Sequence, residues 1–297
     1  MEGKYFDLSQ DDTLGGDSPS TTKIPSQAAL KAYIDAKAQG GGQWTPKWFY
    51  VEDASGAVNT LTIKKSNNSL EDKVFEWSLD QQNWTEVTIT DTTGESIAVP
   101  ANGRVYLRGD NGALAKSAGL YTKINCTAVF NIGGDITTLI VRSGGQQYIL
   151  PYCFRSLFDS SRVKDASLLH LTPKTLNSYC YQSLFSWCSS LTAAPELPAT
   201  TLEQSCYQQM FLGCTALTTT PNIPDVIMAS NSMTQMFSGC SSLAKVVVSI
   251  TVWNASNATQ WLNNVAATGD FYNLGGATIP TGTNGIPSGW TEHTQLP

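Results

Sequence analysis

Apolar and polar residues alternate along residues 45–118, and turn-forming residues separate the alternating runs. A period of two is typical of strands that bury one face. The sequence predicts strands over residues 48–51, 61–63, 74–77, 86–89, 96–99 and 105–108, with turns at 53–56, 80–83 and 101–103. Short strands joined by tight turns indicate a small β-sandwich over 45–118, which we interpret as a spacer domain.

A twelve-residue phrase recurs in the second half of the chain. It reads CYQSLFSWCSSL from Cys180, CYQQMFLGCTAL from Cys206 and SMTQMFSGCSSL from Ser232, and a shorter copy, CFRSLF, begins at Cys153. All four copies contain a phenylalanine at the same position, Phe158, Phe185, Phe211 and Phe237, and these are 27, 26 and 26 residues apart. A fixed period in this range predicts a solenoid, in which each unit buries its apolar face by stacking on its neighbours.

Each repeat is expected to hold a short helical piece around the phrase, followed by a strand-like segment such as 191–198 or 217–224. Prolines end these segments because proline cannot donate to a strand ladder. Strand-like runs at 121–124, 127–132 and 137–141 are predicted to cover the first open face of the solenoid, and residues 251–297 to close the far end. The predicted solenoid with its caps therefore spans 119–297.

Six of the seven cysteines fall into two repeat columns, and Cys126 stands alone. The columns are Cys153, Cys180 and Cys206, and Cys188, Cys214 and Cys240. We interpret them as buried thiols in a stacked core. A disulfide framework or a metal site are the alternatives, but the chain lacks a C-x-x-C pair and its eight-residue spacing fits no usual zinc knuckle. We expect no metal and no cofactor.

Residues 1–44 form the predicted attachment arm and helix. A polar stretch over 1–25 precedes a helix-forming segment at 27–37, whose apolar stripe is Leu30, Tyr33 and Ile34, and three glycines at 40–42 end it. A helix this short is marginal alone in water. It is expected to pack against a second copy, another protein or its own chain.

Charge and hydropathy exclude some partners. Charged residues make up 14% of the chain, the net charge is −6, and lysines and arginines do not cluster, which argues against nucleic-acid binding. The sequence contains no run of 18 apolar residues, so we expect no membrane insertion. The first residues lack the basic and apolar parts of a signal peptide, so we expect synthesis in the cytoplasm. If the protein acts outside the cell, it is expected to leave by another route, of which release by lysis inside an assembled particle is one.

The phrase Met-Phe-x-Gly-Cys-x-x-Leu at 210–217 and 236–243, with Leu-Pro or Ile-Pro after it, resembles the BspA-like leucine-rich repeats over about residues 150–250. The ending is similar to closing segments that follow such repeats in gut Bacteroidales and their phages. The opening, with Leu14-Gly-Gly and then Ile24-Pro-Ser-Gln, resembles the attachment region of bacteriophage fibre proteins. This second resemblance implies a trimeric structural component of the virion that joins other virion proteins through its N-terminus.

The expected function is therefore a fibre or appendage protein that displays its repeats to a bacterial surface glycan or protein. A BspA-type bacterial surface adhesin is the alternative, and a polysaccharide-acting enzyme is the third hypothesis. We do not expect this protein to be an enzyme. Neither His170 nor His293 lies in a recognisable Ser-His-Asp arrangement, and the acidic pairs at 11–12 and 71–72 are interpreted as solvated turn charge.

Trp187 is the candidate binding residue of the repeat region. It occupies the position that is Gly213 and Gly239 in the next two repeats, where a large side chain should be exposed. Exposed aromatic side chains stack on sugars or anchor protein partners. The other interpretation is that Trp187 forms a lid over the neighbouring cap.

Overall fold

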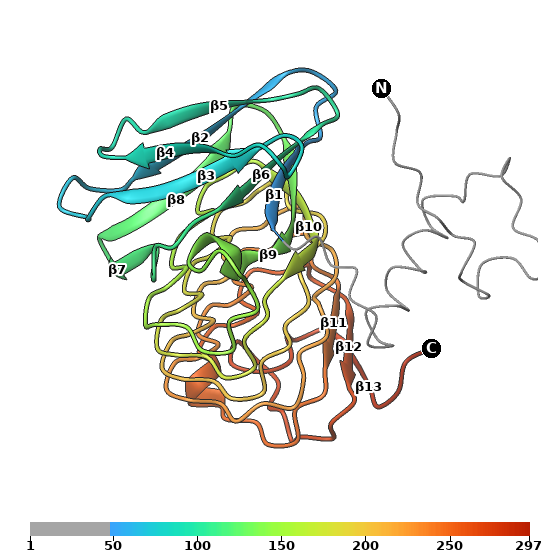
Figure 1. The fold of residues 1–297 in the computed structure, drawn as a ribbon. Coiled ribbons are helices and arrows are strands. Elements are labelled where there is room, and N and C mark those ends of the chain that lie inside the picture. The colour runs from blue at the N-terminus through green and yellow to red at the C-terminus, as the bar shows by residue number, and fades with distance from the viewer. Residues whose placement is uncertain (1–47) are drawn as a thin grey trace, which may run out of the picture. The chain divides into compact units, whose positions relative to one another are not determined.

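The computed structural model describes residues 48–297, and the first part of this region forms two β-sheets (Figure 1). One has the strand order β10-β9-β1-β6-β3-β4 and the other β5-β2-β8-β7. The strands are β1 (Phe49–Asp53), β2 (Asn59–Lys65), β3 (Lys73–Ser78), β4 (Thr85–Ile89), β5 (Glu95–Val99), β6 (Arg104–Arg108), β7 (Ala115–Ser117), β8 (Leu120–Cys126), β9 (Phe130–Asp135) and β10 (Val163–His170). The six strands predicted before residue 118 are confirmed, and so is the mainly β fold.

Alternating side chains build the core of the sheets. Along β2 the buried residues are Asn59, Leu61, Ile63 and Lys65, and the residues between them are more exposed. The apolar members pack in one cluster with residues such as Phe75 of the other sheet. This is the arrangement that a period of two predicts when each sheet buries one face.

The sheets continue past the predicted boundary at residue 118. Strands β7 and β8 pair across it through Ser117 and Leu120. Strand β8 also pairs with β2, and β9 lies between β1 and β10. Residues expected to form only a cap therefore supply strands to both sheets.

The predicted strand at 137–141 is wrong, because η2 (Ile136–Leu139) is a short 3-10 helix. The Asp135 carboxylate accepts hydrogen bonds from the backbone N–H of Thr137 at 2.9 Å and from its hydroxyl at 2.7 Å. Such a cap stabilises a helical turn directly after β9 and ends the ladder.

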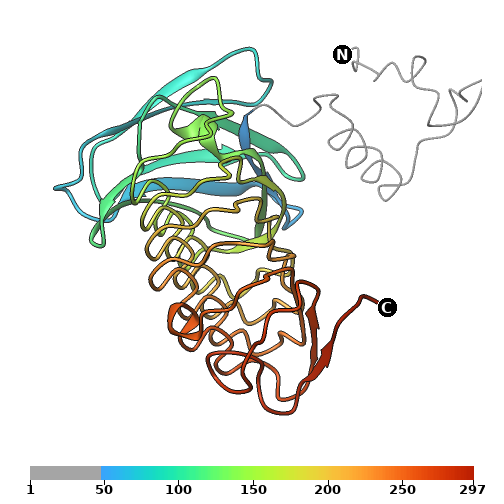
Figure 2. The same cartoon turned by 90° about the horizontal axis from the view of Figure 1, so that it is seen from below.

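Successive repeats stack as coils that are joined by backbone hydrogen bonds (Figure 2). The N–H of Phe185 donates to the carbonyl of Met210, and the N–H of Phe211 donates to that of Met236, both at 2.9 Å. Intervening N–H groups, such as that of Cys188, donate instead to the carbonyl three residues earlier in the same coil. The chain thus alternates between bonds within a coil and bonds to the next coil.

The helical piece predicted in each repeat is wrong. The phrase forms consecutive turns in which every fourth residue has a positive φ, as at Tyr179, Ser183 and Trp187. A left-handed residue in each turn interrupts an α-helix, and half of the N–H groups are used between coils. Among the described residues, helices are limited to η2 and η3 (Ala255–Ala258).

A column of phenylalanine rings forms the centre of the coils. Phe185, Phe211 and Phe237 are fully buried and lie nearly parallel, with centroid distances of 5.6 and 5.2 Å. The column continues through Phe158 to Phe49 of β1, at 5.9 Å. Its other end contacts Trp261. The core of the coils is therefore continuous with the core of the sheets.

All seven cysteines are free and buried, as the thiol interpretation predicted. The Sγ atoms of Cys188, Cys214 and Cys240 donate to phenylalanine carbonyls of the preceding coil at 3.0–3.1 Å. Burial raises the pKa of Cys188 to about 12. These thiols are packing groups of the core and remain protonated at neutral pH.

The far end of the coils is a parallel three-stranded sheet of β11 (Lys245–Val248), β12 (Asp270–Asn273) and β13 (Thr291–His293). Two tryptophans fasten the closing segment: Trp261 Nε1 donates to the Gly285 carbonyl and Trp290 Nε1 to the Ala266 carbonyl, each at 2.8 Å.

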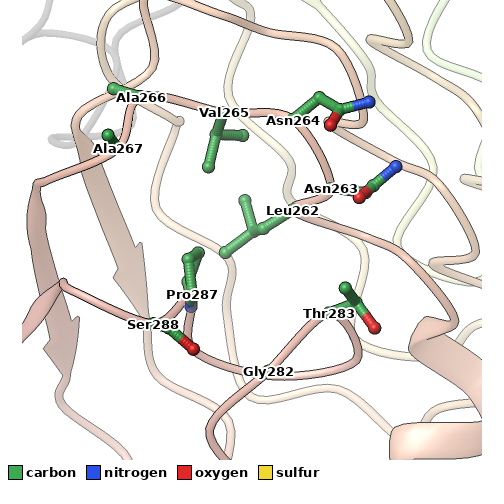
Figure 3. Close-up of a pocket in the computed structure, with 10 residues that line it drawn as sticks. All are labelled: Leu262, Asn263, Asn264, Val265, Ala266, Ala267, Gly282, Thr283, Pro287 and Ser288. Atoms are coloured by element: carbon green, nitrogen blue, oxygen red, sulfur yellow. The ribbon is translucent and has the colours of Figure 1, made fainter.

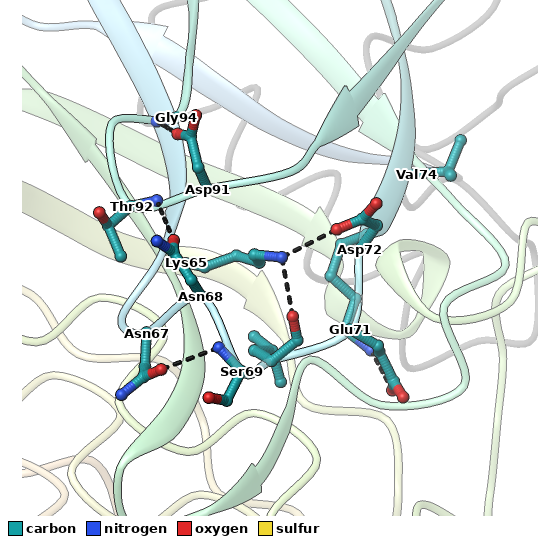
Figure 4. Close-up of polar contacts among 12 residues, drawn as sticks. Lys65, Asn67, Asn68, Ser69, Glu71, Asp72, Val74, Asp91, Thr92 and Gly94 are labelled. Carbon is teal, nitrogen blue, oxygen red and sulfur yellow. Dashed lines mark hydrogen bonds and ion pairs between the residues drawn. The ribbon is translucent and has the colours of Figure 1, made fainter.

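Two buried lysines organise the loop before β3 (Figure 4). The Nζ atom of Lys65 donates to the Leu70 carbonyl at 2.7 Å and to Asp72 at 2.8 Å, and Lys73 pairs with Glu71 at 2.8 Å. The acidic pair Glu71 and Asp72, expected to be solvated turn charge, thus compensates two buried ammonium groups.

Candidate functional site

The left-handed residues of the coils line up in three columns on one surface, which we call the turn face. The columns are Tyr152, Tyr179, Ser205 and Asn231; Ser156, Ser183, Gln209, Gln235 and Gln260; and Ser160, Trp187, Gly213, Gly239 and Asn264. The backbone conformation thus repeats from coil to coil, but the side chains differ in exposure: Trp187 and Gln260 are exposed, whereas Ser156, Ser183 and Ser205 are buried.

Trp187 lies on the turn face with 59% of its surface exposed and a φ of 59°. Its ring lies over Gly213 of the next coil, where an added Cβ would come within 2.4 Å of the Trp187 Cε3 atom. The ring therefore covers a glycine of the following repeat, and the role of Trp187 as a lid over the neighbouring cap stays a prediction.

The middle column of the turn face is a ladder of glutamine amides. Gln209 Nε2 donates to Gln235 Oε1 at 2.8 Å, and Gln235 Nε2 donates to Gln260 Oε1 at 3.0 Å. Each amide nitrogen donates to the amide oxygen of the next coil, always in the same direction along the column, so the amides are held in fixed orientations. They can present donors and acceptors to a hydroxyl-rich ligand at the spacing of the coils.

Beside this ladder lies an aromatic and cationic cluster that our sequence reasoning missed. Tyr152 and Tyr179 stack with centroids 4.7 Å apart and an angle of 2° between their planes. Arg155 Nη1 donates to Gln182 Oε1, and Gln182 Nε2 donates to Gln208 Oε1 at 2.6 Å. The signal was available, since each of these pairs is one repeat apart in the sequence.

A second aromatic cluster, on the six-stranded sheet, is internally compensated. The guanidinium of Arg108 lies 3.8 Å from the ring centroid of Trp84, which contacts Trp48 edge-on at 5.1 Å. Glu76 pairs with Arg108 at 2.5 Å and with Arg142 at 3.3 Å. Both arginines of this cluster pair with a carboxylate, so we interpret the cluster as a structural element of the six-stranded sheet.

Two shallow depressions lie away from these clusters. Leu262, Val265 and Pro287 point toward the centre of the first, which has a volume of about 220 Å³ (Figure 3). The other, of about 340 Å³, adjoins the exposed side chains of Ile227 and Val252. Small-molecule sites have volumes of about 300–1,000 Å³, so the first depression is too small and the second is near the lower limit.

Potential catalytic groups are engaged in local structure. His293 contacts Asp270 at 2.7 Å and stacks on Tyr272 at the closing sheet. Within residues 48–297, no three His, Cys, Asp or Glu side chains are grouped as metal ligands. In the same part of the chain, no helix has the length and apolar character needed to cross a bilayer.

No family model, curated protein or solved structure matches this chain. The predicted attachment residues Leu30, Tyr33 and Ile34 lie outside the described residues. The candidate site is therefore the turn face, which contains Trp187, the glutamine ladder and the cluster around Arg155.

Proposed function

We propose that this protein is a structural component of a bacteriophage particle that binds the bacterial surface through its turn face. Residues 1–44 attach it to other virion proteins as a trimer, and the coils face outward. The first part of the proposal rests on the resemblance of residues 14–37 to fibre attachment regions. The second rests on the geometry of Trp187.

Trp187 carries the binding proposal because it is a large aromatic side chain that is exposed on the turn face. Its left-handed backbone is the regular conformation of the coils, which serine, tyrosine, glutamine and asparagine residues adopt at equivalent positions. The next two repeats have glycine at this position, Gly213 and Gly239. Exposed aromatic side chains stack on ligands or anchor protein partners. A binding role explains why an exposed ring replaces glycine in this repeat.

The coils are proposed to be a BspA-like leucine-rich-repeat solenoid. The period of the phrase, the phenylalanine column and the bonds between coils support this assignment. In this proposal the two sheets and the three-stranded closing sheet protect the ends of the stack.

The alternative, a BspA-type surface adhesin, would use the same turn face. A virion protein should co-sediment with particles, whereas an adhesin should fractionate with cell envelopes. The polysaccharide-acting enzyme is less well supported, because Glu71 and Asp72 each pair with a buried lysine.

Replacing Trp187 with alanine should weaken binding to purified host-surface polysaccharide at least about tenfold, or ~1.4 kcal/mol, because an exposed ring is lost from the contact surface. The unfolding midpoint should change little. Surface plasmon resonance with the immobilised polysaccharide measures the affinity. Ile227→Ala is the matched control, since it removes an exposed apolar side chain outside the turn face. Equal affinity of Trp187→Ala and the native protein would refute the role of Trp187.

Changing both Leu30 and Ile34 to aspartate should abolish the trimer and incorporation into particles. Each buried side chain contributes about 1.5–3 kcal/mol, multiplied by the symmetry of the assembly. Sedimentation and particle co-purification measure the two effects, with circular dichroism as the test that the remaining fold is intact. Lys31→Asp, a change between the same apolar positions, is the control. Normal trimers in the double variant would overturn the attachment hypothesis.

A further inference from the structure

The cluster around Arg155 contains a cation without a carboxylate partner among the described residues. Arg155 is half-buried, and the phenols of Tyr152, Tyr121 and Tyr179 are close enough to act on it electrostatically. Within residues 48–297, no carboxylate forms an ion pair with it. The neighbouring phenols are neutral at pH 7, so the guanidinium keeps a full uncompensated charge.

Other half-buried arginines of the described chain are treated differently. Arg104 pairs with Glu52 at 2.7 Å, and Arg108 pairs with Glu76 at 2.5 Å. Both also lie over aromatic rings, so an aromatic neighbour does not replace a carboxylate in this fold. Within residues 48–297, Arg155 differs from these two because no carboxylate pairs with it.

The guanidinium of Arg155 is also held in place. Gln182 accepts from its Nη1 atom and is itself fixed by donating to Gln208. The buried Nε atom has no hydrogen-bond partner within residues 48–297, and that loss is costly for a charged group. Nη2 forms no hydrogen bond with the described residues, which leaves its donor capacity unused.

The surroundings select the chemistry of that ligand. A guanidinium matches the planar fork of a carboxylate. A single cation among neutral groups suits a singly charged anion better than a phosphate monoester, which carries up to two charges. A phosphodiester also carries one charge, but it is tetrahedral and lacks the planar fork of a carboxylate. The stacked tyrosines provide an aromatic surface and hydroxyl groups beside the cation, and Gln208 continues the row of amides. Rings and amides of this kind contact sugars.

We propose that Arg155, Tyr152, Tyr179 and Gln182 form a subsite for the carboxylate of an acidic sugar in the bacterial surface glycan. This inference rests on the proposed function and specifies its ligand. Trp187 and the glutamine ladder contact neutral parts of the same glycan, and the Arg155 subsite gives the preference for uronic acids.

Oligogalacturonate and its methyl ester test this assignment, because esterification removes the negative charges while the sugar backbone stays the same. By calorimetry, the full-length protein should bind the acid at least about tenfold more tightly than the ester, and added salt should reduce the difference. Poly(glycerol phosphate) is the third probe. Equal binding or no binding of the acid and the ester overturns the proposal, as does tighter binding of the phosphate polymer.

Arg155→Gln is the decisive variant, because glutamine continues the row formed by Gln182 and Gln208 while the charge is removed. It should bind the acid and the ester equally, with an unchanged unfolding midpoint. Arg155→Lys should retain part of the preference and guards against a folding defect in the first variant. Arg162→Gln removes the same charge at an exposed site outside the cluster and should keep the full preference.

The outcomes separate this inference from the proposed function. If Arg155→Gln keeps the preference for the acid, the subsite is wrong. If the native protein ignores the carboxylate but still binds host polysaccharide through Trp187, the subsite is wrong and the proposed function stands. If the native protein binds none of these glycans, host polysaccharide included, both proposals fail.

Discussion

Replacing Phe211 with alanine is expected to lower the free energy of unfolding by about 3–5 kcal/mol, the range for truncating a buried phenylalanine. Phe211 is fully buried between two parallel rings, those of Phe185 and Phe237. Neither neighbour can fill the space without leaving its own coil. Because coils interact mainly with adjacent coils, the loss should separate the repeats on either side.

Hydrogen exchange with mass spectrometry locates this effect along the chain. Residues 205–264 should lose protection in Phe211→Ala, whereas the sheets at 49–108 should keep it, since their strands are also held together by pairing within each sheet. Thr215→Ala, an exposed change in the same coil, should alter stability by no more than about 0.5 kcal/mol. The phenylalanine column continues from the coils into the sheets, and this continuity could make the two regions unfold together. If it couples the coils to the sheets in one cooperative unit, both regions will lose protection together and the predicted independence will be wrong.

The protein should unfold between about pH 9 and pH 11, even with reductant present. Burial raises the pKa of Cys153, Cys206 and Cys240 from the ordinary 9.0 to about 12. The other buried thiols are raised by the same cause. The folded chain then holds protons that the unfolded chain releases, so stability is complete below pH 9 and is lost as the pH rises toward 12.

The size of this alkaline effect follows from the number of thiols. Each buried thiol lowers the free energy of unfolding by roughly 1.4 kcal/mol for each pH unit above the pKa that the thiol has in the unfolded chain. Near pH 10 the seven together approach the whole stability of a typical domain, about 5–15 kcal/mol. Urea unfolding followed by tryptophan fluorescence at several pH values measures the slope.

A variant with Cys206 and Cys214 changed to alanine provides the control. It should start from a lower stability at pH 7 but lose less stability per pH unit, because two titrating groups are gone. Reductant should change neither curve. A free energy of unfolding that stays constant from pH 8 to pH 10 would show that the buried thiols do not govern alkaline stability.

Local patterns in the sequence predicted the strands β1 to β6 with their turns. Strict alternation and turn residues act over a few neighbours, so they are readable without the fold. The repeat period likewise placed Phe185, Phe211 and Phe237 in one column and the cysteines in two. A fixed spacing determines which residues share a column, whatever the conformation between them.

The conformation between those columns was not readable in this way. The phrase in each repeat has the composition of a short helix, yet it forms turns with left-handed residues, because its N–H groups find acceptors in the next coil. Those acceptors are about 25 residues away and exist only after stacking. For the same reason, β8 and β9 joined the sheets instead of forming only a cap.

By itself, then, the sequence determined the mainly β character, the repeat and its buried columns, and the exposed position of Trp187, since each depends on spacing and residue type. Only the tertiary structure decided the site. Tyr152 and Tyr179 meet as a stacked pair, and Arg155 remains without a carboxylate while Arg104 and Arg108 have one. Ion pairing depends on which distant side chains come within about 4 Å, and that is a property of packing across coils and strands.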